Sequence, residues 1–268
     1  MILRRPAAGM YQRHPMRVVV QWHAIALLPF IVFPLTAVAG PVEDASETGR
    51  LLAILLDAGR DTIAKKQDLI NDASKANKGF TSDVFERQVA EEFQQRTGIA
   101  LANLDTAQVP AMAKPLLARL MQESKKTIDT YQSVINVPGF AYKGLIPATF
   151  GTETATRFQS WSGIYMKQTA PSHLVRNPRN KPDDYESAVF ARFSTHSPGE
   201  APDKVFAEVT EDGKFVRVLL PLFYQRSCLG CHGEPKGQRD ISGYPREGAR
   251  EGELGGAISV KLPPPPPQ

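Results

Sequence analysis

Cysteine is scarce in this sequence: only Cys228 and Cys231 occur among its 268 residues. Two thiols this close along the chain cannot form a framework of disulfides across a fold. No second cysteine pair is present to complete a four-cysteine zinc site. The scarcity therefore excludes a disulfide scaffold and a cysteine-rich zinc module.

Acidic residues are absent from the first 39 positions. The four arginines of this segment account for the entire formal net charge of +4; they are Arg4, Arg5, Arg13 and Arg17. The rest of the chain is neutral overall, so a basic surface that attracts phosphate groups is not indicated. We expect no nucleic-acid partner.

Long hydrophobic runs are also lacking. The apolar run at residues 24–35 is short of the roughly 20 residues that a membrane-spanning helix needs. It follows the arginines and precedes Ala37-Val38-Ala39, a small-x-small pattern of the kind that signal peptidase cuts. The pattern predicts a Sec-type signal peptide over residues 1–39 and a periplasmic or secreted protein that begins at Gly40. A start at Met16 and an uncleaved N-terminal membrane anchor are the alternatives.

Both cysteines lie in the stretch Ser227-Cys-Leu-Gly-Cys-His-Gly233. C-x-x-C-H is the pattern of covalent haem attachment: two thiols add to the two vinyl groups of one porphyrin edge, and the histidine binds the iron. The stretch predicts one haem c per chain, attached at Cys228 and Cys231 with His232 as proximal ligand. A dithiol redox pair and a zinc site are the alternatives, but the zinc site would need a further ligand.

The second axial ligand of the iron is less clear from the sequence. The mature chain offers no third cysteine, so the candidates are histidines and methionines: His173, His196, Met112, Met121 and Met166. We nominate His173, which lies between Thr169-Ala-Pro171 and Leu174-Val-Arg-Asn177, with Met166 next. The nearby Pro171 and Pro178 restrict the backbone, which would help to hold a ligand in place. An empty sixth position would instead permit binding of a small molecule.

The sequence repeats itself at an offset of 65 residues. About a third of positions 51–99 recur, including Phe85 as Phe150, Lys78 as Lys143 and Gly79 as Gly144. An internal duplication is indicated. Each copy has the pattern helix, loop, helix, and we interpret the shared Asn, Lys and Gly residues as structural, building the same turn twice.

The predicted elements divide the chain into a helical part and a strand-rich part. Helices are expected near residues 51–63, at 82–96 with Ser82 as N-cap, at 116–128 and at 183–195 with Asp183 or Asp184 as cap, with a short helical turn at 107–113. Strands are expected at 165–169, 205–210, 215–220 and 257–262, the middle two joined by a hairpin at Asp212-Gly213. The domain boundaries follow: a first repeat at 40–115, a second repeat with the haem domain at 116–262 and a polyproline tail at 263–268.

Several motifs together resemble a known family, the c-type haem, PAS-like sensor domains long described as a domain of unknown function. They lie at residues 143–147, 169–171, 174–177, 181–183, 227–237, 243–245 and 255–259. The resemblance covers nearly the whole mature chain. It implies an α+β fold with a long N-terminal helix on a small antiparallel sheet and haem in a PAS-like pocket.

Two further assignments concern the haem surroundings. Arg176 is a candidate to hold a haem propionate, since a guanidinium binds a carboxylate with two hydrogen bonds, and Asn177 would fix its loop. The alternative is an ordinary ion pair of Arg176 with Asp183 or Asp184. Aromatic side chains that could line the porphyrin, or simply belong to the core, are Trp161, Phe158, Phe206, Phe215, Phe223 and Tyr224.

The function expected is a redox-sensing or gas-sensing module rather than an enzyme. No output domain follows the haem motif in the sequence, so a membrane-bound sensor or a redox protein is the expected partner, and a diatomic gas is a candidate ligand. A soluble electron-transfer cytochrome is the alternative, and a dithiol oxidoreductase remains only if no haem is attached.

Overall fold

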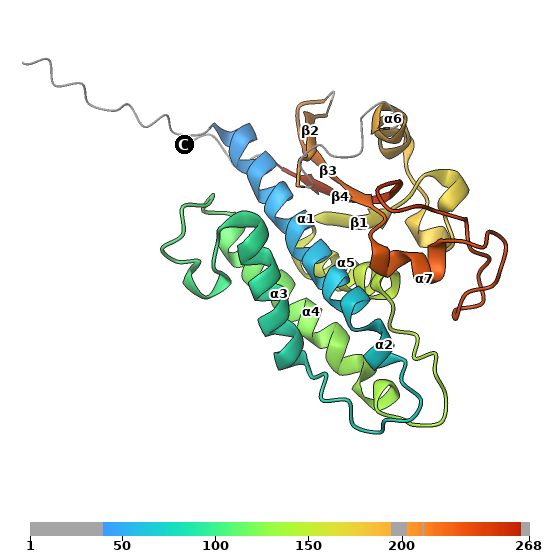
Figure 1. The fold of residues 1–268 in the computed structure, drawn as a ribbon. Helices are drawn as coiled ribbons and strands as arrows, with labels where there is room; N and C mark the ends of the chain where they lie inside the picture. The colour runs from blue at the N-terminus through green and yellow to red at the C-terminus, as the bar shows by residue number, and fades with distance from the viewer. Residues whose placement is uncertain (1–39, 194–202, 211, 264–268) are drawn as a thin grey trace, which may run out of the picture. The chain divides into compact units, whose positions relative to one another are not determined.

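The structure is a computed structural model that describes residues 40–193, 203–210 and 212–263 (Figure 1). Its α-helices are α1 (Pro41–Lys65), α2 (Gln67–Ile70), α3 (Ser82–Thr97), α4 (Ala113–Ile135), α5 (Pro147–Ser162), α6 (Asp184–Phe193) and α7 (Leu229–His232). Its strands are β1 (Tyr165–Thr169), β2 (Phe206–Val209), β3 (Val216–Phe223) and β4 (Leu254–Leu262). The expected leader, the residues 264–268 of the polyproline tail and His196 lie outside the described residues. No described helix is long and apolar enough to cross a membrane.

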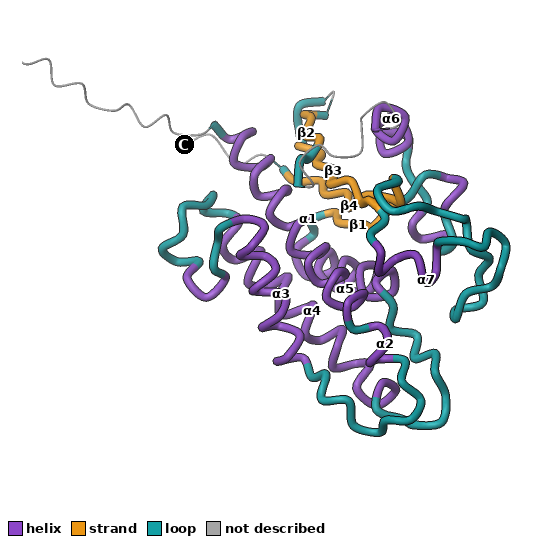
Figure 2. Tube along the Cα trace, viewed as in Figure 1, coloured by secondary structure: helices purple, strands orange, loops and turns teal. Residues whose placement is uncertain are grey.

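Within the described residues, the strands form one antiparallel sheet in the order β1-β4-β3-β2 (Figure 2). The hairpin of β2 and β3 pairs Val209 with Val216 and turns through Gly213, whose φ of 69° is a backbone conformation that glycine adopts without strain. β4 returns from far along the chain to pair with both β3 and β1. The expected α+β class is confirmed.

Alternate side chains of β3 face two different hydrophobic layers. Val216, Val218 and Leu220 join the main core with α1 and α5, whereas Leu219 joins a smaller cluster with Val189, Phe190 and Phe193 of α6. This follows from the two-residue period of a strand. The sheet is therefore covered by α1 and α5 on one face and by α6 on the other.

The helical part is built from two equivalent copies that contact each other reciprocally. The side chain of Gln67 donates to the carbonyl of Leu145, and that of Gln132, 65 positions later, donates to the carbonyl of Phe80. Leu145 and Phe80 are themselves equivalent positions. Phe85 and Phe150 meet where the copies adjoin, with ring centroids 5.2 Å apart. Equivalent residues thus make equivalent contacts across the pair of copies.

The turn that follows the first helix of each copy shows the same exchange. The backbone N–H of Lys78 donates to Asn136, and that of Lys143 donates to Asn71. Both lysine side chains are buried and reach a backbone carbonyl, at Ile135 and at Val137. The recurring Asn, Lys and Gly residues therefore serve the turn itself, as the sequence indicated.

Helix ends were predicted less well than helix interiors. The N-cap of α3 is Thr81, whose hydroxyl accepts from the N–H of Val84, so the prediction of Ser82 was wrong by one residue. The helical turn predicted at 107–113 is also wrong: a short 3-10 helix lies earlier, at Leu101–Asn103, and α4 begins at Ala113. Residues in turns and at helix ends show no apolar periodicity, so the sequence indicated neither the N-cap of α3 nor the start of α4 strongly.

The cap of α6 is Asp183, one of the two residues predicted. Asp183 accepts from the N–H of Glu186, while the carboxylate of Glu186 accepts from the N–H of Asp183. This reciprocal capping box satisfies two donors that the start of a helix otherwise leaves free. It also turns Asp183 toward Arg217, its ion-pair partner at 3.0 Å.

Candidate functional site

The C-x-x-C-H stretch lies where β3 ends and the chain turns before β4. Tyr224, directly after β3, exchanges backbone hydrogen bonds with Gly252 and Glu253, just before β4. A 3-10 turn at Arg226–Cys228 and the single turn α7 follow. The N-cap residue of the 3-10 turn, Gln225, donates to Asp61 of α1 over 3.3 Å. The backbone bonds beside the sheet thus hold together the two ends of the segment 225–252, which carries the cysteines, and α1 contacts its start.

Both cysteine thiols are free and partly exposed. Cys228 ends the 3-10 turn and Cys231 lies within α7, so the two side chains are separated by about one helical turn. Burial and the nearby carboxylate of Asp240 raise the pKa of the Cys231 thiol. The Cys231 thiol is therefore protonated at neutral pH, unlike the activated thiolate that a dithiol oxidoreductase uses for attack.

His232 is oriented by three contacts. Its carbonyl accepts from the N–H of Ala249 at 2.8 Å, its ring lies 5.0 Å from that of Tyr224, and its Nδ1 is 2.9 Å from Oε2 of Glu247. An ionised carboxylate can only accept, so Nδ1 carries the proton and donates it. Among the described residues, Nε2 of His232 has no hydrogen-bond partner. Its lone pair is therefore available to a metal.

Arg176 connects the pieces of the site. Its guanidinium donates to both oxygens of Glu247 over 2.7 and 2.8 Å, to Asp240 over 2.6 Å and to the carbonyl of Cys231 over 2.9 Å. Its partners are therefore neither Asp183 nor Asp184, which the ion-pair alternative had named. The role of Arg176 toward a propionate stays a prediction.

Asp240 is the buried carboxylate of this arrangement. Its side chain has 0 % exposure, and its second oxygen, Oδ1, accepts from the N–H and hydroxyl of Ser242 and from the N–H of Tyr244. A buried carboxylate is stable only when paired and hydrogen-bonded in this way. Residues 240–247 are therefore folded around one buried charge, with Arg176 as its counter-ion.

Burial, together with the charge of Arg176, keeps the imidazole of His232 neutral. Burial and the adjacent Arg176 guanidinium lower the pKa of His232. Burial alone would raise the pKa of Glu247, but the hydrogen bonds from Arg176 and His232 outweigh it and lower that pKa. A neutral imidazole beside an ionised carboxylate is the form in which histidine binds metals, and the carboxylate increases its basicity.

The segment before α6 forms one wall of a shallow cleft of about 390 Å³ next to the cysteine turn. His173 is exposed on a 3-10 turn (Ser172–Leu174) and lines this cleft together with Arg176, Tyr244 and Glu247. The side chain of Asn177 accepts from the N–H of Arg179 and so closes the next turn. His173 and the network of Arg176 thus share one cleft, while a bond from His173 to iron stays a prediction.

The methionines lie elsewhere. Met121 and Met166 are buried in the main core, and Met112 packs against it. Most aromatic candidates are also committed to other contacts: Phe158 is in the main core, Phe206 packs on α6, and Trp161 lies on the helical part, against Arg119. Of the named aromatics, Tyr224 is the one whose ring lies against His232.

Two charged residues of the site were not identified from the sequence, Glu247 and Asp240. Each lies within a loop without periodicity, and each acquires its role only when residues 240–247 fold back onto Arg176. The sole signal was their position beside the Gly243-Tyr-Pro245 turn, which brings the two carboxylates to the same side.

The second helical copy also reaches this site. Burial, followed by the charge of Asp240, raises the pKa of Tyr142. Tyr142 precedes Lys143 in the second turn, and its equivalent in the first copy is Asn77. The two copies therefore share a scaffold, but the loop of the second one adjoins the cysteine turn.

Comparisons with known proteins complete these observations. One solved structure that resembles the chain is the crystal structure of the cyanobacterial heme-protein Tll0287, with 18% sequence identity, a TM-score of 0.39 and coverage of 57% of this chain and 93% of that one. No curated protein has a sequence that matches this chain. The model of the Tll0287-like family matches residues 41–263, nearly the whole described part. The family resemblance noted in the sequence is thereby confirmed: the chain belongs to the Tll0287-like family.

Proposed function

We propose that this chain binds one haem c at Cys228 and Cys231, with Nε2 of His232 as the proximal ligand. The observation that carries the proposal is the orientation of His232, whose Nδ1–H is bound by Glu247 and whose Nε2 is left without a partner among the described residues. Membership of the Tll0287-like family, in which the protein Tll0287 is a heme-protein, supports it.

The residues present fit such a group. The two free thiols lie on consecutive helical turns and can both form thioethers, and the adjacent imidazole is neutral and directed by a carboxylate. When bound, haem supplies an iron that changes oxidation state and binds small ligands. Glu247, Arg176 and Asp240 would hold the imidazole in place and keep negative charge close to it.

Attachment is tested by expressing the chain in a host competent in cytochrome c maturation. The wild-type protein should retain haem through denaturing electrophoresis, and the double variant Cys228→Ala/Cys231→Ala should lose denaturant-resistant haem staining. Ser227→Ala is the matched control, since it changes a neighbour without removing a thiol. A colourless wild-type protein would contradict the proposal.

We infer that the chain serves as a redox-sensing or gas-sensing module in a PAS-like arrangement. The three methionines that could bind iron pack in or against the main core, which leaves the second axial position to His173, to another group or to an external ligand. A replaceable ligand is what a sensor of diatomic gases requires. We propose a membrane-bound sensor or redox protein as its partner, with no catalytic activity of its own.

The second candidate is a soluble electron carrier. Cys228, Cys231 and His232 are all partly exposed, so the porphyrin edge with the thioethers would lie near the surface, as electron transfer needs. Optical spectra of oxidised and reduced protein, with and without carbon monoxide, separate the two. Binding of carbon monoxide favours sensing, whereas a low-spin spectrum that carbon monoxide leaves unchanged favours electron transfer.

The same spectra test His173. If its imidazole is the sixth ligand, His173→Ala should convert a low-spin spectrum into a high-spin one and open the iron to carbon monoxide. Met166→Leu is the control, because a buried core methionine should tolerate this exchange of similar volume without a spectral change. A low-spin spectrum that survives His173→Ala would contradict the assignment.

We also propose export with cleavage after Ala39, on the basis of the leader pattern alone. Mass spectrometry of the protein isolated from the periplasm should give a chain that begins with Gly40-Pro41. Retention of residues 1–39 in a membrane fraction would favour an N-terminal anchor instead.

A further inference from the structure

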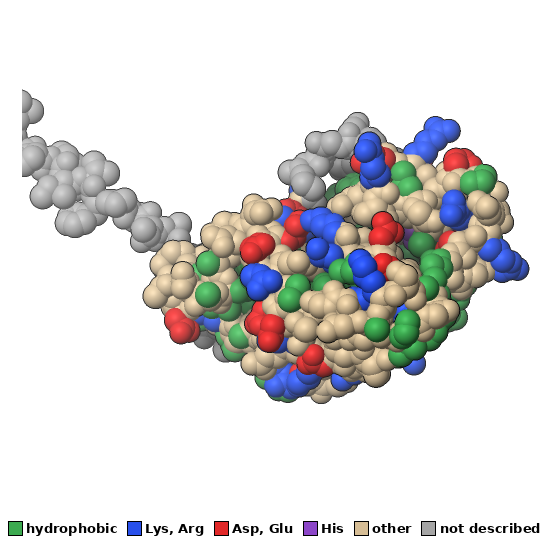
Figure 3. All heavy atoms as spheres, turned by 60° about the horizontal axis from the view of Figure 1, so that its bottom comes forward, with side chains coloured by type: hydrophobic (Ala, Val, Ile, Leu, Met, Phe, Trp, Pro, Cys, Tyr) green, Lys and Arg blue, Asp and Glu red, His purple; other side chains and the backbone are tan. Residues whose placement is uncertain are grey.

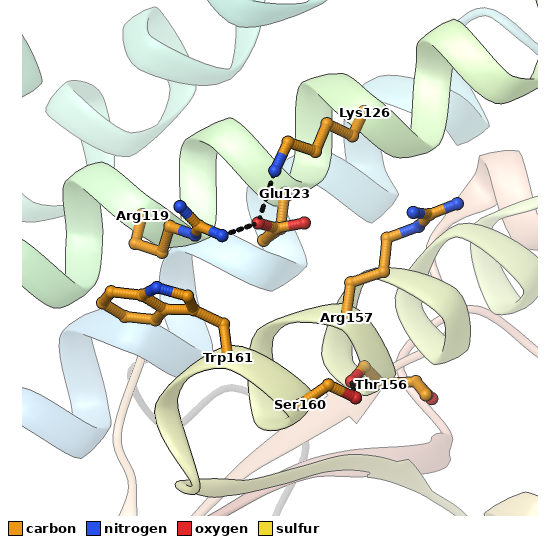
Figure 4. A pocket seen from close by; sticks show the side chains of 7 residues that line it. All are labelled: Arg119, Glu123, Lys126, Thr156, Arg157, Ser160 and Trp161. Atoms are coloured by element: carbon orange, nitrogen blue, oxygen red, sulfur yellow. Dashed lines mark hydrogen bonds and ion pairs between the residues drawn. The ribbon is translucent and has the colours of Figure 1, made fainter.

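A second cleft, of about 400 Å³, lies between α4 and α5 on the helical part, away from the cysteine turn (Figure 4). Three cationic side chains line it, with one acid, two hydroxyls and one indole: Arg119, Lys126, Arg157, Glu123, Thr156, Ser160 and Trp161. With three cations against one carboxylate, the lining has an excess of two positive charges. The face drawn in Figure 3 carries side chains of both signs.

The charges of this cleft are incompletely paired. Glu123 accepts from Arg119 over 2.8 Å and from Lys126 over 2.9 Å, whereas Arg157 has one hydrogen bond, to the hydroxyl of Thr130, and no ion pair among the described residues. The Nε atom of Arg119 is buried without a hydrogen-bond partner. The remaining guanidinium donors of Arg157 are therefore available here for an anion.

An apolar surface adjoins these donors. Trp161 is 49 % exposed, although tryptophan side chains are on average highly buried. The Arg119 guanidinium lies 4.6 Å from the centre of its ring. Figure 4 shows Trp161 at one end of the cleft and Arg157 at the other, with Glu123 between them. The cleft thus combines an apolar end and a cationic end.

The duplication shows that the scaffold does not require these residues. The positions equivalent to Arg119, Lys126 and Arg157 in the first copy are Ile54, Asp61 and Glu92. Ile54 is fully buried, and Glu92 pairs with Lys65. The same helices therefore fold with apolar or acidic residues at these positions, and the cations belong to the second copy alone.

We propose that the cleft between α4 and α5 binds a small organic carboxylate with a flat apolar part, its carboxylate at Arg157 and its apolar part on the indole of Trp161. A guanidinium matches the geometry of a carboxylate with two hydrogen bonds. This site is independent of the haem proposal.

The test uses the full-length protein and calorimetric titration with benzoate and with benzamide, which has nearly the same shape but no charge. Benzoate should bind saturably with a Kd on the order of 1 mM, and benzamide about tenfold more weakly. Arg157→Gln and Trp161→Leu should each weaken benzoate binding about tenfold. Arg87→Gln, an exposed arginine on α3, is the control and should leave binding unchanged.

The thermal midpoint of each variant shows that it remains folded. Three results would overturn the proposal: equal binding of benzoate and benzamide, benzoate binding that survives both Arg157→Gln and Trp161→Leu, and no saturation below about 50 mM benzoate. Tighter binding of inorganic phosphate than of benzoate would also overturn it, since the apolar end would then contribute nothing.

Discussion

The helical copies and the cysteine loop are ordered by different forces. Residues 41–163 pack through buried apolar side chains and reciprocal contacts between equivalent positions, such as Phe85 with Phe150. Residues 224–253 contain little regular structure and fold around the buried charge of Asp240 and its counter-ion Arg176. The first region is stable through many small, redundant contacts, whereas the second depends on a few strong polar ones.

The largest effect should come from breaking the apolar region at its centre. Phe85→Ala and Phe150→Ala should each lower the free energy of unfolding by about 3–4 kcal/mol, because both rings are fully buried and a cavity would remain. Because the positions are equivalent, the two losses should agree within about 1 kcal/mol. Urea denaturation measures them, with the half-exposed Val134→Ala as control; a loss at one position alone would refute the equivalence.

A smaller and local effect is expected in the cysteine loop. Arg176→Met should cost about 2–4 kcal/mol, because it leaves Asp240 buried and without a counter-ion. Hydrogen exchange should show the loss of protection at residues 231–249 while α1 and α4 stay protected. The exposed Arg179→Met in the same segment is the control. Uniform loss of protection throughout the chain would show that the two regions are not separate.

The equivalence of the two turns gives a third prediction. Lys78→Met and Lys143→Met keep the apolar stem of each lysine but remove its hydrogen bonds to backbone carbonyls, at Lys75 and Ile135 for Lys78 and at Val137 for Lys143. Each should destabilise the protein by about 1 kcal/mol. Thermal denaturation checks both values, and Lys66→Met beside the first turn serves as control. A cost at Lys143 several times that at Lys78 would contradict the equivalence of the two turns.

The smallest effect concerns pH, at the contact between the two regions. Burial and the neighbouring Asp57 raise the pKa of Asp61 to about 6, against the opposing charges of Arg60 and Arg96. The folded state then holds a proton that the unfolded state has released, so the contribution of Asp61 to stability should fall as pH rises from about 4 to about 6 and stay lower above that.

Asp61→Asn removes this dependence. The variant should be about 1 kcal/mol more stable than the wild type at pH 7.5, and the difference should vanish near pH 4. Denaturation across this pH range checks it, with the exposed Asp68→Asn as control. A stability difference between variant and wild type that shrinks from pH 4 to pH 6 would contradict the sign.

The sequence was most informative where a pattern repeats. Helices, strands and the duplication followed from apolar spacing and from the offset of 65 residues, and the α+β class followed from them. It was least informative at single positions, such as the cap at Thr81, where neighbouring residues could serve equally well. Arg176 was singled out from its chemistry, but its partners Asp240 and Glu247 are more than 60 residues away, in a loop without periodicity.

By itself, the sequence determined the spacing of Cys228, Cys231 and His232, because that chemistry is local to five consecutive residues, and it determined the repeated helical scaffold, because periodicity is carried along the chain. Only the tertiary structure decided which carboxylate directs His232, where Arg176 places its charge and which copy's loop adjoins the cysteines. These contacts join segments far apart in sequence, and their energy depends on burial, which exists only once the chain is folded.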